Sequence, residues 1–479
     1  MDARSQRSPR GRGRAGRPGR WAVSALALCA LLSAACSAGT APSPDAQREP
    51  PCRRTLVGVA HPDDDVFFLT PEIRRTVRAG CPVDTVYLTA GDGGITDPGR
   101  AREYADSREY GVRAAYAEMA ETANEWQRAD VQADGVRVRS YRLVDRDRDA
   151  DVRLTFLDLH DGMPHGGHPN SLRRLYEGRQ SAVTAFRGDA SYTEDSLVAT
   201  VSGLLKVSGA ERILTMDHDH ASFAFGLGGR VDHSDHGIGA RYVRRAGYAL
   251  GVPVTTYLGY TMSPLRANLT PGQVAEKDEV VRWYIAHRTC RPSGTCSNVP
   301  PYRGTLKEDW RLWVHRQYEQ VHRPPRRGEV VADVGRTTYA TGRDPAQCLH
   351  GDGGTAATAA VRLHGCDGSA AQQWEVRGDG TVRPRHRARA CLTVSGPDAV
   401  RLEPCREGSP AQRWAREPWR SSTWSRRAWR LVGMGGRCLS QDDRKLPARW
   451  DSRDRTSPLL VFAACGTVPR PEDYWSWAG

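Results

Sequence analysis

Apolar and polar positions alternate between two periodicities from about residue 52 to residue 325. Short apolar runs predict strands: TLVGVA (55–60), VDTVYLTA (83–90), VRLTFLDL (152–159), RILTMD (212–217) and VPVTTYLGY (252–260). Between and after these runs, apolar residues at helical spacing predict helices over 107–126, 196–208, 236–250 and 273–287. Strands that alternate with helices favour an α/β domain with a largely parallel sheet.

The pattern changes after the Pro/Arg-rich stretch PPRRGE at 324–329. From about residue 330 the chain is rich in Gly, Arg and Trp, with short strand-like runs and many turns. A Cys-Leu pair followed by a second Cys and a Trp occurs three times, beginning at Cys348, Cys391 and Cys438, which are 43 and 47 residues apart. Repeats this small cannot bury their own apolar faces, so the three are expected to share one core.

The repeats end in AQQW (371–374), AQRW (411–414) and DYW (473–475), and they resemble those of the ricin-type β-trefoil over 340–479. The third repeat departs from the pattern because it lacks the Gln. The resemblance implies an all-β C-terminal domain in which the three Trp side chains meet in one core. It also implies a disulfide within each repeat: Cys348–Cys366, Cys391–Cys405 and Cys438–Cys465.

The N-terminal residues follow neither pattern. An Arg-rich start leads into the apolar stretch WAVSALALCALLSAAC (21–36) and then into small residues, which is typical of a secretory signal. The apolar stretch is short for a transmembrane helix. Cleavage before Cys36 would resemble bacterial lipoprotein processing, but Ser33 stands where such signals usually carry Leu, so lipidation and plain secretion both stay open.

These boundaries predict five segments along the chain. They are a signal (1–36), a linker (37–51), an α/β domain (52–325), a second linker (326–339) and a trefoil (340–479).

Charge and cysteine content add two constraints. The formal net charge is +13, but +6 of it lies in the first 35 residues, and no nucleic-acid motif accompanies the modest remainder. Ten cysteines follow Cys36, an even number that predicts disulfides in an exported chain, and none has the C-x-x-C spacing of a zinc site. Outside the repeats, Cys52 with Cys81 and Cys290 with Cys296 are predicted to form structural disulfides.

The main chemical signal is HPDDD at 61–65, which follows the first predicted strand. Burying His61, Asp63 and Asp64 together without a counter-charge would be costly, because the carboxylates repel one another. The loop after a central strand is the usual ligand position in an α/β sheet, and a divalent metal favours ionised carboxylates and neutral imidazole. The alternative is a solvated Asp-rich turn that caps a helix starting near Val66.

A second cluster, VDHSDHG at 231–237, places His233 and His236 three positions apart before a predicted helix, where both can face one site. H-P-D-D behind a strand together with this H-x-x-H resembles the PIG-L/LmbE-like family of zinc-dependent N-deacetylases. The signatures of that family are A-H-P-D-D-E and H-P-D-H, and the resemblance covers about residues 55–290.

The resemblance implies a Rossmann-like three-layer fold and a role for five residues. His61, Asp64 and His236 would be the zinc ligands, which leaves a position open for water. Two His and a carboxylate also suit iron or another divalent ion. Asp63 would be the general base, and His233, as an imidazolium, would stabilise the oxyanion.

Two positions depart from the family signatures. Asp65 replaces Glu, which is expected to alter the geometry around the ligands, and Ser234 replaces Pro without an expected effect. Arg108 and Asp161 are weaker candidates for substrate binding, and their alternatives are a solvated helix residue and a turn residue. The Gly-rich loop AGDGG at 90–94 lacks the length and the Lys of a phosphate-binding loop.

Sugar-binding trefoils of this type often carry an Asp shortly after Cys-Leu and an Asn just before Gln-x-Trp. Here the first places hold His350, Thr393 and Ser440, and the second hold Ala371 and Ala411. Carbohydrate binding by the trefoil and a purely structural role therefore both stay open.

Together, these features predict an exported metal-dependent hydrolase that removes an acetyl group from an N-acetylated sugar or glycoconjugate. The trefoil would attach it to a polysaccharide or act as a spacer. The expected location is the extracellular face of a bacterial membrane through a lipid anchor, or the secreted fraction. The alternatives are a related amidase for another acyl group and a non-catalytic carbohydrate-binding surface protein, which the complete His/Asp set disfavours.

Overall fold

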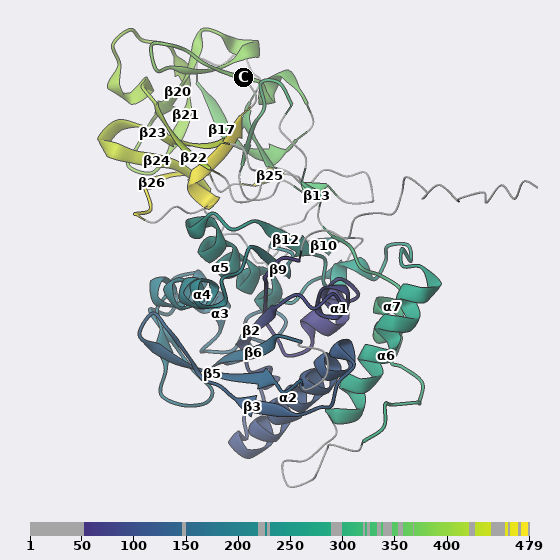
Figure 1. Ribbon diagram of the computed structural model, residues 1–479. Coiled ribbons are helices and arrows are strands. Elements are labelled where there is room, and N and C mark those ends of the chain that lie inside the picture. The colour runs from purple at the N-terminus through teal and green to yellow at the C-terminus, as the bar shows by residue number, and fades with distance from the viewer. Residues whose placement is uncertain are drawn as a thin grey trace, which may run out of the picture. The chain divides into compact units, whose positions relative to one another are not determined.

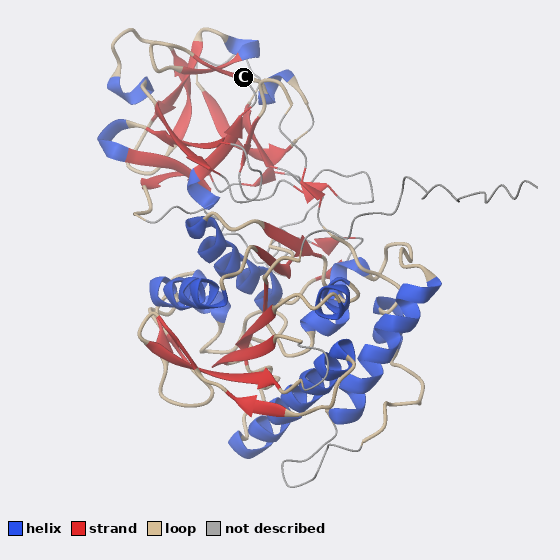
Figure 2. Ribbon diagram, in the orientation of Figure 1, coloured by secondary structure: helices blue, strands red, loops and turns tan. Residues whose placement is uncertain are grey.

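The computed structural model places an α/β part before an all-β part (Figures 1 and 2). It describes residues 52–477 except 146–149, 219–225, 228–229, 289–298, 320, 323–325, 333–336, 339–346, 353–357, 367, 421–426, 442–455, 458–459 and 468–470. The predicted signal, the first linker and the Cys290–Cys296 pair lie outside these residues. No helix in the described part of the chain is long and apolar enough to cross a membrane.

The N-terminal part contains an eight-stranded sheet of order β12-β9-β1-β2-β6-β5-β3, with β4 also paired to β5. Its strands are β1 (Thr55–Val59), β2 (Val83–Thr89), β3 (Trp126–Arg128), β4 (Val131–Ala133), β5 (Val136–Leu143), β6 (Val152–Leu159), β9 (Arg212–Met216) and β12 (Val254–Tyr257). The five predicted strands are all parallel neighbours, from β12 to β6. The antiparallel strands β3 to β5 were missed because they lack the continuous apolar run of a strand buried on both faces.

Seven α-helices accompany this sheet in the described residues. They are α1 (Glu72–Arg78), α2 (Pro98–Ala120), α3 (Leu172–Tyr176), α4 (Glu194–Ser208), α5 (Ser234–Leu250), α6 (Pro271–His287) and α7 (Glu308–Trp313). The predictions for α4, α5 and α6 are confirmed to within two residues. The helix predicted over 107–126 instead begins after Asp97, whose side chain caps it, and ends at Glu121, which has a left-handed φ of 52°.

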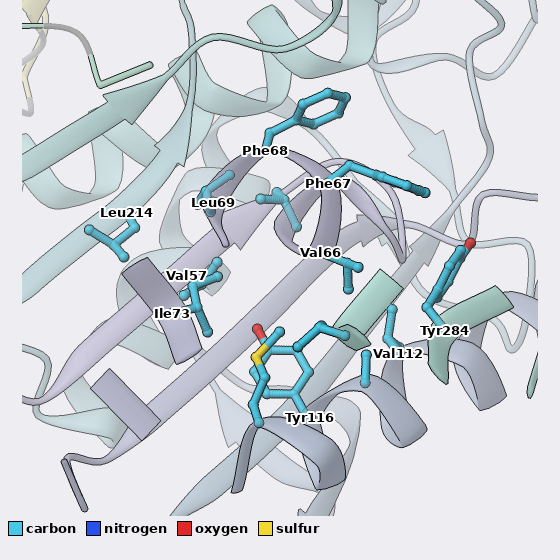
Figure 3. Close-up of a cluster of buried hydrophobic side chains, with 14 of the residues drawn as sticks. Val57, Val66, Phe67, Phe68, Leu69, Ile73, Val112, Tyr116, Leu214 and Tyr284 are labelled. Carbon is cyan, nitrogen blue, oxygen red and sulfur yellow. The ribbon is translucent and has the colours of Figure 1, made fainter. Parts of the chain in front are cut away.

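Two apolar cores lie on the two faces of the sheet, because successive strand side chains point to opposite sides. Val57 and Val59 of β1 pack with side chains of α1, α2, α6 and α7, and part of this core is shown in Figure 3. Leu56 packs in the second core, with side chains of α3, α4 and α5. The described residues thus form the predicted three layers, helices–sheet–helices, with β1 in the middle.

Three two-stranded pairs connect or border these elements. They are β7 (Val183–Thr184) with β8 (Ser191–Tyr192), β10 (Gly226–Leu227) with β11 (Arg230–Val231), and β13 (Val321–His322) with β15 (Thr337–Thr338).

The C-terminal part is all-β, as the resemblance to the trefoil implied, and its strands pair antiparallel. They are β14 (Val330–Ala332), β16 (Gln347–Gly351), β17 (Ala359–Gly365), β18 (Trp374–Val376), β19 (Val382–Pro384), β20 (Ala390–Val394), β21 (Val400–Pro404), β22 (Ala415–Arg420), β23 (Arg427–Val432), β24 (Arg437–Gln441), β25 (Thr456–Ser457), β26 (Leu460–Ala464) and β27 (Tyr474–Trp477).

The three repeats share one core, in which Trp374, Trp414 and Trp475 are buried. Each indole N–H donates to the carbonyl of the Leu in its own Cys-Leu pair, at 2.7, 2.9 and 2.9 Å. In the third repeat, Asp473 stands where the other two repeats have Gln. The predicted disulfides Cys52–Cys81, Cys348–Cys366, Cys391–Cys405 and Cys438–Cys465 are present.

Candidate metal centre

The loop that follows β1 folds back on itself and brings Asp64 against His61. The backbone N–H groups of Asp63 and Asp64 both donate to the His61 carbonyl, at 2.8 and 3.2 Å. The Asp64 carboxylate accepts from the His61 N–H at 2.7 Å. A short π-helical turn (Asp65–Leu69) follows, but the Asp64 side chain makes no capping hydrogen bond to it. Asp64 is also buried, so the alternative of a solvated capping turn is wrong.

The second His cluster lies at the start of α5, which packs against β1. His233 is the N-cap residue of α5, and its Nδ1 accepts from the Asp235 N–H at 3.2 Å. The ring centroids of His233 and His236 lie 4.5 and 5.2 Å from that of His61. The structure therefore brings together two motifs that are about 170 residues apart in the sequence.

The side chains at this point fit a divalent cation. One nitrogen from each of His61, His233 and His236 lies within 4.8 Å of the others, and all three side chains are buried. The Nε2 atoms of His61 and His236 have no hydrogen bond of acceptable geometry, although Asp64 Oδ1 lies 2.9 Å from His236 Nε2. Buried nitrogens in this condition are rare in proteins, and a metal ion would satisfy them.

Electrostatics at the centre follow from burial and from the close carboxylates. Burial lowers the pKa of His236, but Asp64 and Asp232 outweigh it and raise the pKa to about 10. Asp64 and Asp161 in the same way raise the pKa of His61 well above its ordinary value. Burial raises the pKa of Asp64, but the two neighbouring imidazoles hold it well below its usual range. Negative charge thus dominates at these imidazoles, which favours a cation.

His233 differs from the other two imidazoles. Burial and the neighbouring His61 lower its pKa to about 4, and its Nδ1 already accepts a backbone hydrogen bond. A neutral ring with the proton on Nε2 satisfies both observations. Both observations favour a neutral ring here, whereas the family resemblance implies an imidazolium, and a neutral Nε2–H is still a hydrogen-bond donor.

Two carboxylates beside these histidines were missed by the sequence analysis. Asp232 Oδ1 lies 2.8 Å from His236 Nδ1 and also accepts from the N–H groups of His233 and Tyr260. A carboxylate on the far nitrogen of a ligating His fixes its tautomer and orientation. Asp235 accepts from the Gly162 N–H and lies 3.5 Å from His61 Nε2. Their positions within VDHSDH were the available signal.

Asp63 points to a different set of partners. Its Oδ1 accepts from the guanidinium of Arg108, and its Oδ2 accepts from the hydroxyl of Tyr284 at 2.9 Å. Arg108 is 9% exposed, so the alternative of a solvated helix residue is wrong. Tyr284 lies on α6, and nothing in its sequence surroundings singled it out.

Asp161 faces the same histidines from the loop after β6. Its two oxygens lie 3.7 Å from His61 Nε2 and 3.5 Å from His233 Nε2. Burial raises its pKa, but His61, His233 and Arg108 outweigh burial and lower it to about 2. The loop is held by Asp92, which accepts from the Asp161 N–H at 2.6 Å. The ionised carboxylate therefore borders the centre.

Asp65, which stands where the family signature has Glu, points away from the histidines into the apolar core. It accepts from the Tyr87 hydroxyl at 2.6 Å, and burial raises its pKa to about 7. The change from Glu is thus accommodated behind the loop that carries His61 and Asp64.

Comparison with known proteins assigns families to the two parts. Residues 56–247 match the model of the GlcNAc-PI de-N-acetylase (PIG-L) family, and residues 336–448 match the ricin-type beta-trefoil lectin domain. No curated protein matches the chain.

Solved structures with similarity to the chain include both kinds of domain. The N,N'-diacetylchitobiose deacetylase from Pyrococcus horikoshii is 15% identical with a TM-score of 0.29, covering 49% of this chain and 70% of that one. The hemolytic lectin CEL-III is 20% identical with a TM-score of 0.23, covering 32% of each chain, so this chain spans about a third of its length. The trefoil lectin of the Vibrio vulnificus hemolysin/cytolysin is 21% identical with a TM-score of 0.19, covering 27% of this chain and 83% of that one.

The two family matches, together with the paired His/Asp motifs and the three Trp repeats, give the same result for each part. The chain carries a PIG-L de-N-acetylase domain followed by a ricin-type β-trefoil lectin domain.

Proposed function

We propose that the protein is a metal-dependent hydrolase that removes the acetyl group from an N-acetylated sugar or glycoconjugate of the N-acetylglucosaminyl type. The observation that carries this proposal is the position of Asp64, whose oxygens lie 3.3 Å from His61 Nδ1 and 2.9 Å from His236 Nε2, beside two buried imidazole nitrogens that lack hydrogen bonds. These three residues would hold zinc or another divalent ion. When bound, the ion would lower the pKa of a water molecule and polarise the amide carbonyl.

The surrounding residues supply the proton transfers. The Asp63 carboxylate takes a proton from the attacking water and returns one to the leaving amine, so that water and the amide give acetate and a free amine. The neutral His233 donates a hydrogen bond from Nε2 to the developing oxyanion. Asp161, ionised beside the centre, accepts hydrogen bonds from the substrate, and Arg108, which donates to the Asp63 carboxylate, contacts the substrate as well.

Export of the protein is part of the same proposal. Four disulfides in the described residues fit an oxidising compartment, as does the signal-like N-terminal sequence.

For the trefoil, we propose contact with a polysaccharide through its first repeat. In the other two repeats, the side chains of Thr393 and Ser440 are buried and bond to Gln412 and Asp473. In the first repeat, Asp352 pairs with the guanidinium of Arg362 and is only partly buried.

Acetate release tests the proposal directly. Metal-loaded protein, a chelated sample and Asp63→Ala would be compared on a panel of substrates that contain N-acetylglucosamine. Acetate released only by the metal-loaded native protein supports the deacetylase. A tightly bound metal without acetate from any substrate contradicts it, and the same panel with other acyl groups then tests the related amidase.

A further inference from the structure

Both oxygens of the Asp63 carboxylate are held, and the two donors come from different helices. Arg108 of α2 donates to Oδ1, and the hydroxyl of Tyr284 on α6 donates to Oδ2 at 2.9 Å. α6 spans Pro271–His287, beyond the end of the family match at residue 247. The contact from Tyr284 is therefore a feature of this chain that the matched motifs do not contain.

The approach of Tyr284 requires a glycine on the neighbouring helix. A Cβ at Gly111 of α2 would lie 2.6 Å from Tyr284 Cδ2 and 2.9 Å from its carbonyl oxygen. The carbonyl belongs to the backbone, so a larger residue would push α6 away from α2. Gly91 makes room for Arg108 in the same way, since a Cβ there would lie 2.9 Å from Arg108 Nε.

The surroundings of Tyr284 fix the direction of its hydroxyl. The ring is fully buried and packs edge-on against Phe67, with centroids 5.8 Å apart. Figure 3 shows Tyr284 beside Val112 at the edge of the apolar core, with its hydroxyl directed away from that residue. Burial and the nearby Asp63 raise the pKa of Tyr284 well above its ordinary value, so the hydroxyl is a donor.

We propose that Tyr284 is a positioning residue, which together with Arg108 fixes the Asp63 carboxylate in the orientation that proton transfer needs. This rests on the proposed role of Asp63 as the base. A carboxylate oxygen has two lone pairs, so each oxygen of Asp63 keeps one for the reacting water. Loss of the hydroxyl would release one oxygen and let the carboxylate turn about the Cβ–Cγ bond. The Asp63 carboxylate would then lose the orientation that proton transfer needs, while the metal ligands stay in place.

Tyr284→Phe tests this role because it removes the hydroxyl and keeps the ring. We expect kcat to fall at least about tenfold, since a misplacement on the order of 1 Å can cost about 10²-fold. KM is expected to stay within about twofold and the metal content to stay unchanged, because the substitution touches neither the substrate nor a ligand. Gly111→Ala is a second variant, which displaces Tyr284 without removing its hydroxyl and should also lower kcat.

Tyr318→Phe is the matched control. Tyr318 packs in the same core, and its hydroxyl donates to the backbone carbonyl of Arg266 at 2.6 Å, outside the metal centre. This variant should lose stability similar to that lost by Tyr284→Phe and keep the native kcat. A native kcat in Tyr284→Phe, or a fall in kcat that is matched by Tyr318→Phe or by loss of metal, overturns the proposal.

Crystal structures of the native protein and Tyr284→Phe give a readout that needs no substrate. We expect the Asp63 carboxylate to have one orientation in the native protein and a shifted or divided one in the variant. An unchanged carboxylate in the variant overturns the positioning role. If the native protein releases no acetate but the carboxylate shifts, the deacetylase proposal fails and the contact stands.

Discussion

The candidate metal centre at the end of β1 and the repeats of the trefoil both bury polar side chains, but those side chains differ in their hydrogen-bond partners. In the centre, the Nε2 atoms of His61 and His236 are buried without hydrogen bonds. In the trefoil, each of the three buried Trp residues donates its indole N–H to a carbonyl of its own repeat. The three indole N–H groups thus have hydrogen-bond acceptors within their repeats, whereas the two imidazole nitrogens have no hydrogen bond.

A third cluster shows that charge alone does not mark a functional site. Glu109 on α2 is buried, and its carboxylate bonds to Arg139 and Arg187, which also lie close to Asp158. Every carboxylate here faces a guanidinium, so the cluster neutralises itself without a further ion. Unpaired ligand atoms, rather than the number of charges, distinguish the metal centre from this network.

Removal of a proposed metal ligand should have the largest effect among the variants that test this difference between the regions. His236→Ala takes away one of the unpaired nitrogens, and we expect it to abolish tight metal binding and with it acetate release. Metal content by elemental analysis and affinity by calorimetry are the measurements. Full metal occupancy in His236→Ala would show that the unpaired nitrogens do not mark the metal position.

Asp232→Asn should weaken metal binding without abolishing it. The substitution keeps the shape of the side chain but removes the charge that faces His236 Nδ1. Metal affinity should fall about 10- to 100-fold, as is typical when a partner of a ligating His is replaced. An unchanged affinity would mean that Asp232 only accepts hydrogen bonds from the backbone N–H groups of its neighbours and does not affect the metal ligand.

Glu109→Gln tests whether the self-neutralised network is structural. Burial raises the pKa of Glu109, but the hydrogen bond and charge of Arg139 outweigh it and lower the pKa from 4.5 to about 2. The ionised carboxylate therefore contributes stability above pH 4.5, about 3 kcal/mol, and this is lost as the pH falls to about 2. Urea denaturation at pH 7 and pH 3 should show a large difference between native and variant at pH 7 and a smaller one at pH 3. A difference that does not change with pH would contradict this account.

Trp414→Phe breaks the bonded pattern in one trefoil repeat. The substitution leaves the buried Leu392 carbonyl without its indole donor and creates a small cavity. We expect a loss of about 2–3 kcal/mol in the free energy of unfolding. The kcat for acetate release should stay at the native value, since Trp414 is part of the trefoil core. A fall in kcat without a fall in stability would show that the trefoil core takes part in catalysis.

Thr393→Val is the smallest expected change. Its hydroxyl accepts from Gln412 at 3.0 Å and donates to the Cys391 carbonyl at 2.9 Å. Loss of these bonds should cost about 1 kcal/mol. Binding to immobilised polysaccharide should not change, because the hydroxyl is used inside the fold. Asp352→Ala in the first repeat is the comparison. Weaker binding by Thr393→Val than by Asp352→Ala would show that the second repeat, and not the first, contacts the polysaccharide.

The local pattern of apolar residues was enough to predict the buried strands and the amphipathic helices. The five parallel strands and helices α4, α5 and α6 were predicted because their apolar residues follow the period of the element. The start of α2 was missed because Asp97 and Pro98 precede any apolar repeat, although an Asp followed by Pro is a helix-start signal. The strands β3 and β4 have only three residues each, and the half-exposed β5 lacks the continuous apolar run by which the parallel strands were identified.

The sequence by itself determined the two His/Asp motifs and the three Cys-Leu repeats, because each has a fixed local spacing. Its resemblance to two families then implied the two domains and the trefoil disulfides. Tertiary structure alone decided that burial and His61 lower the pKa of His233, that Asp232 supports His236, and that Tyr284 reaches Asp63 from a helix about 220 residues away. These properties depend on burial and on distances between segments remote in the chain. A protonation state or a hydrogen bond of this kind exists only once packing has removed water and fixed the neighbours.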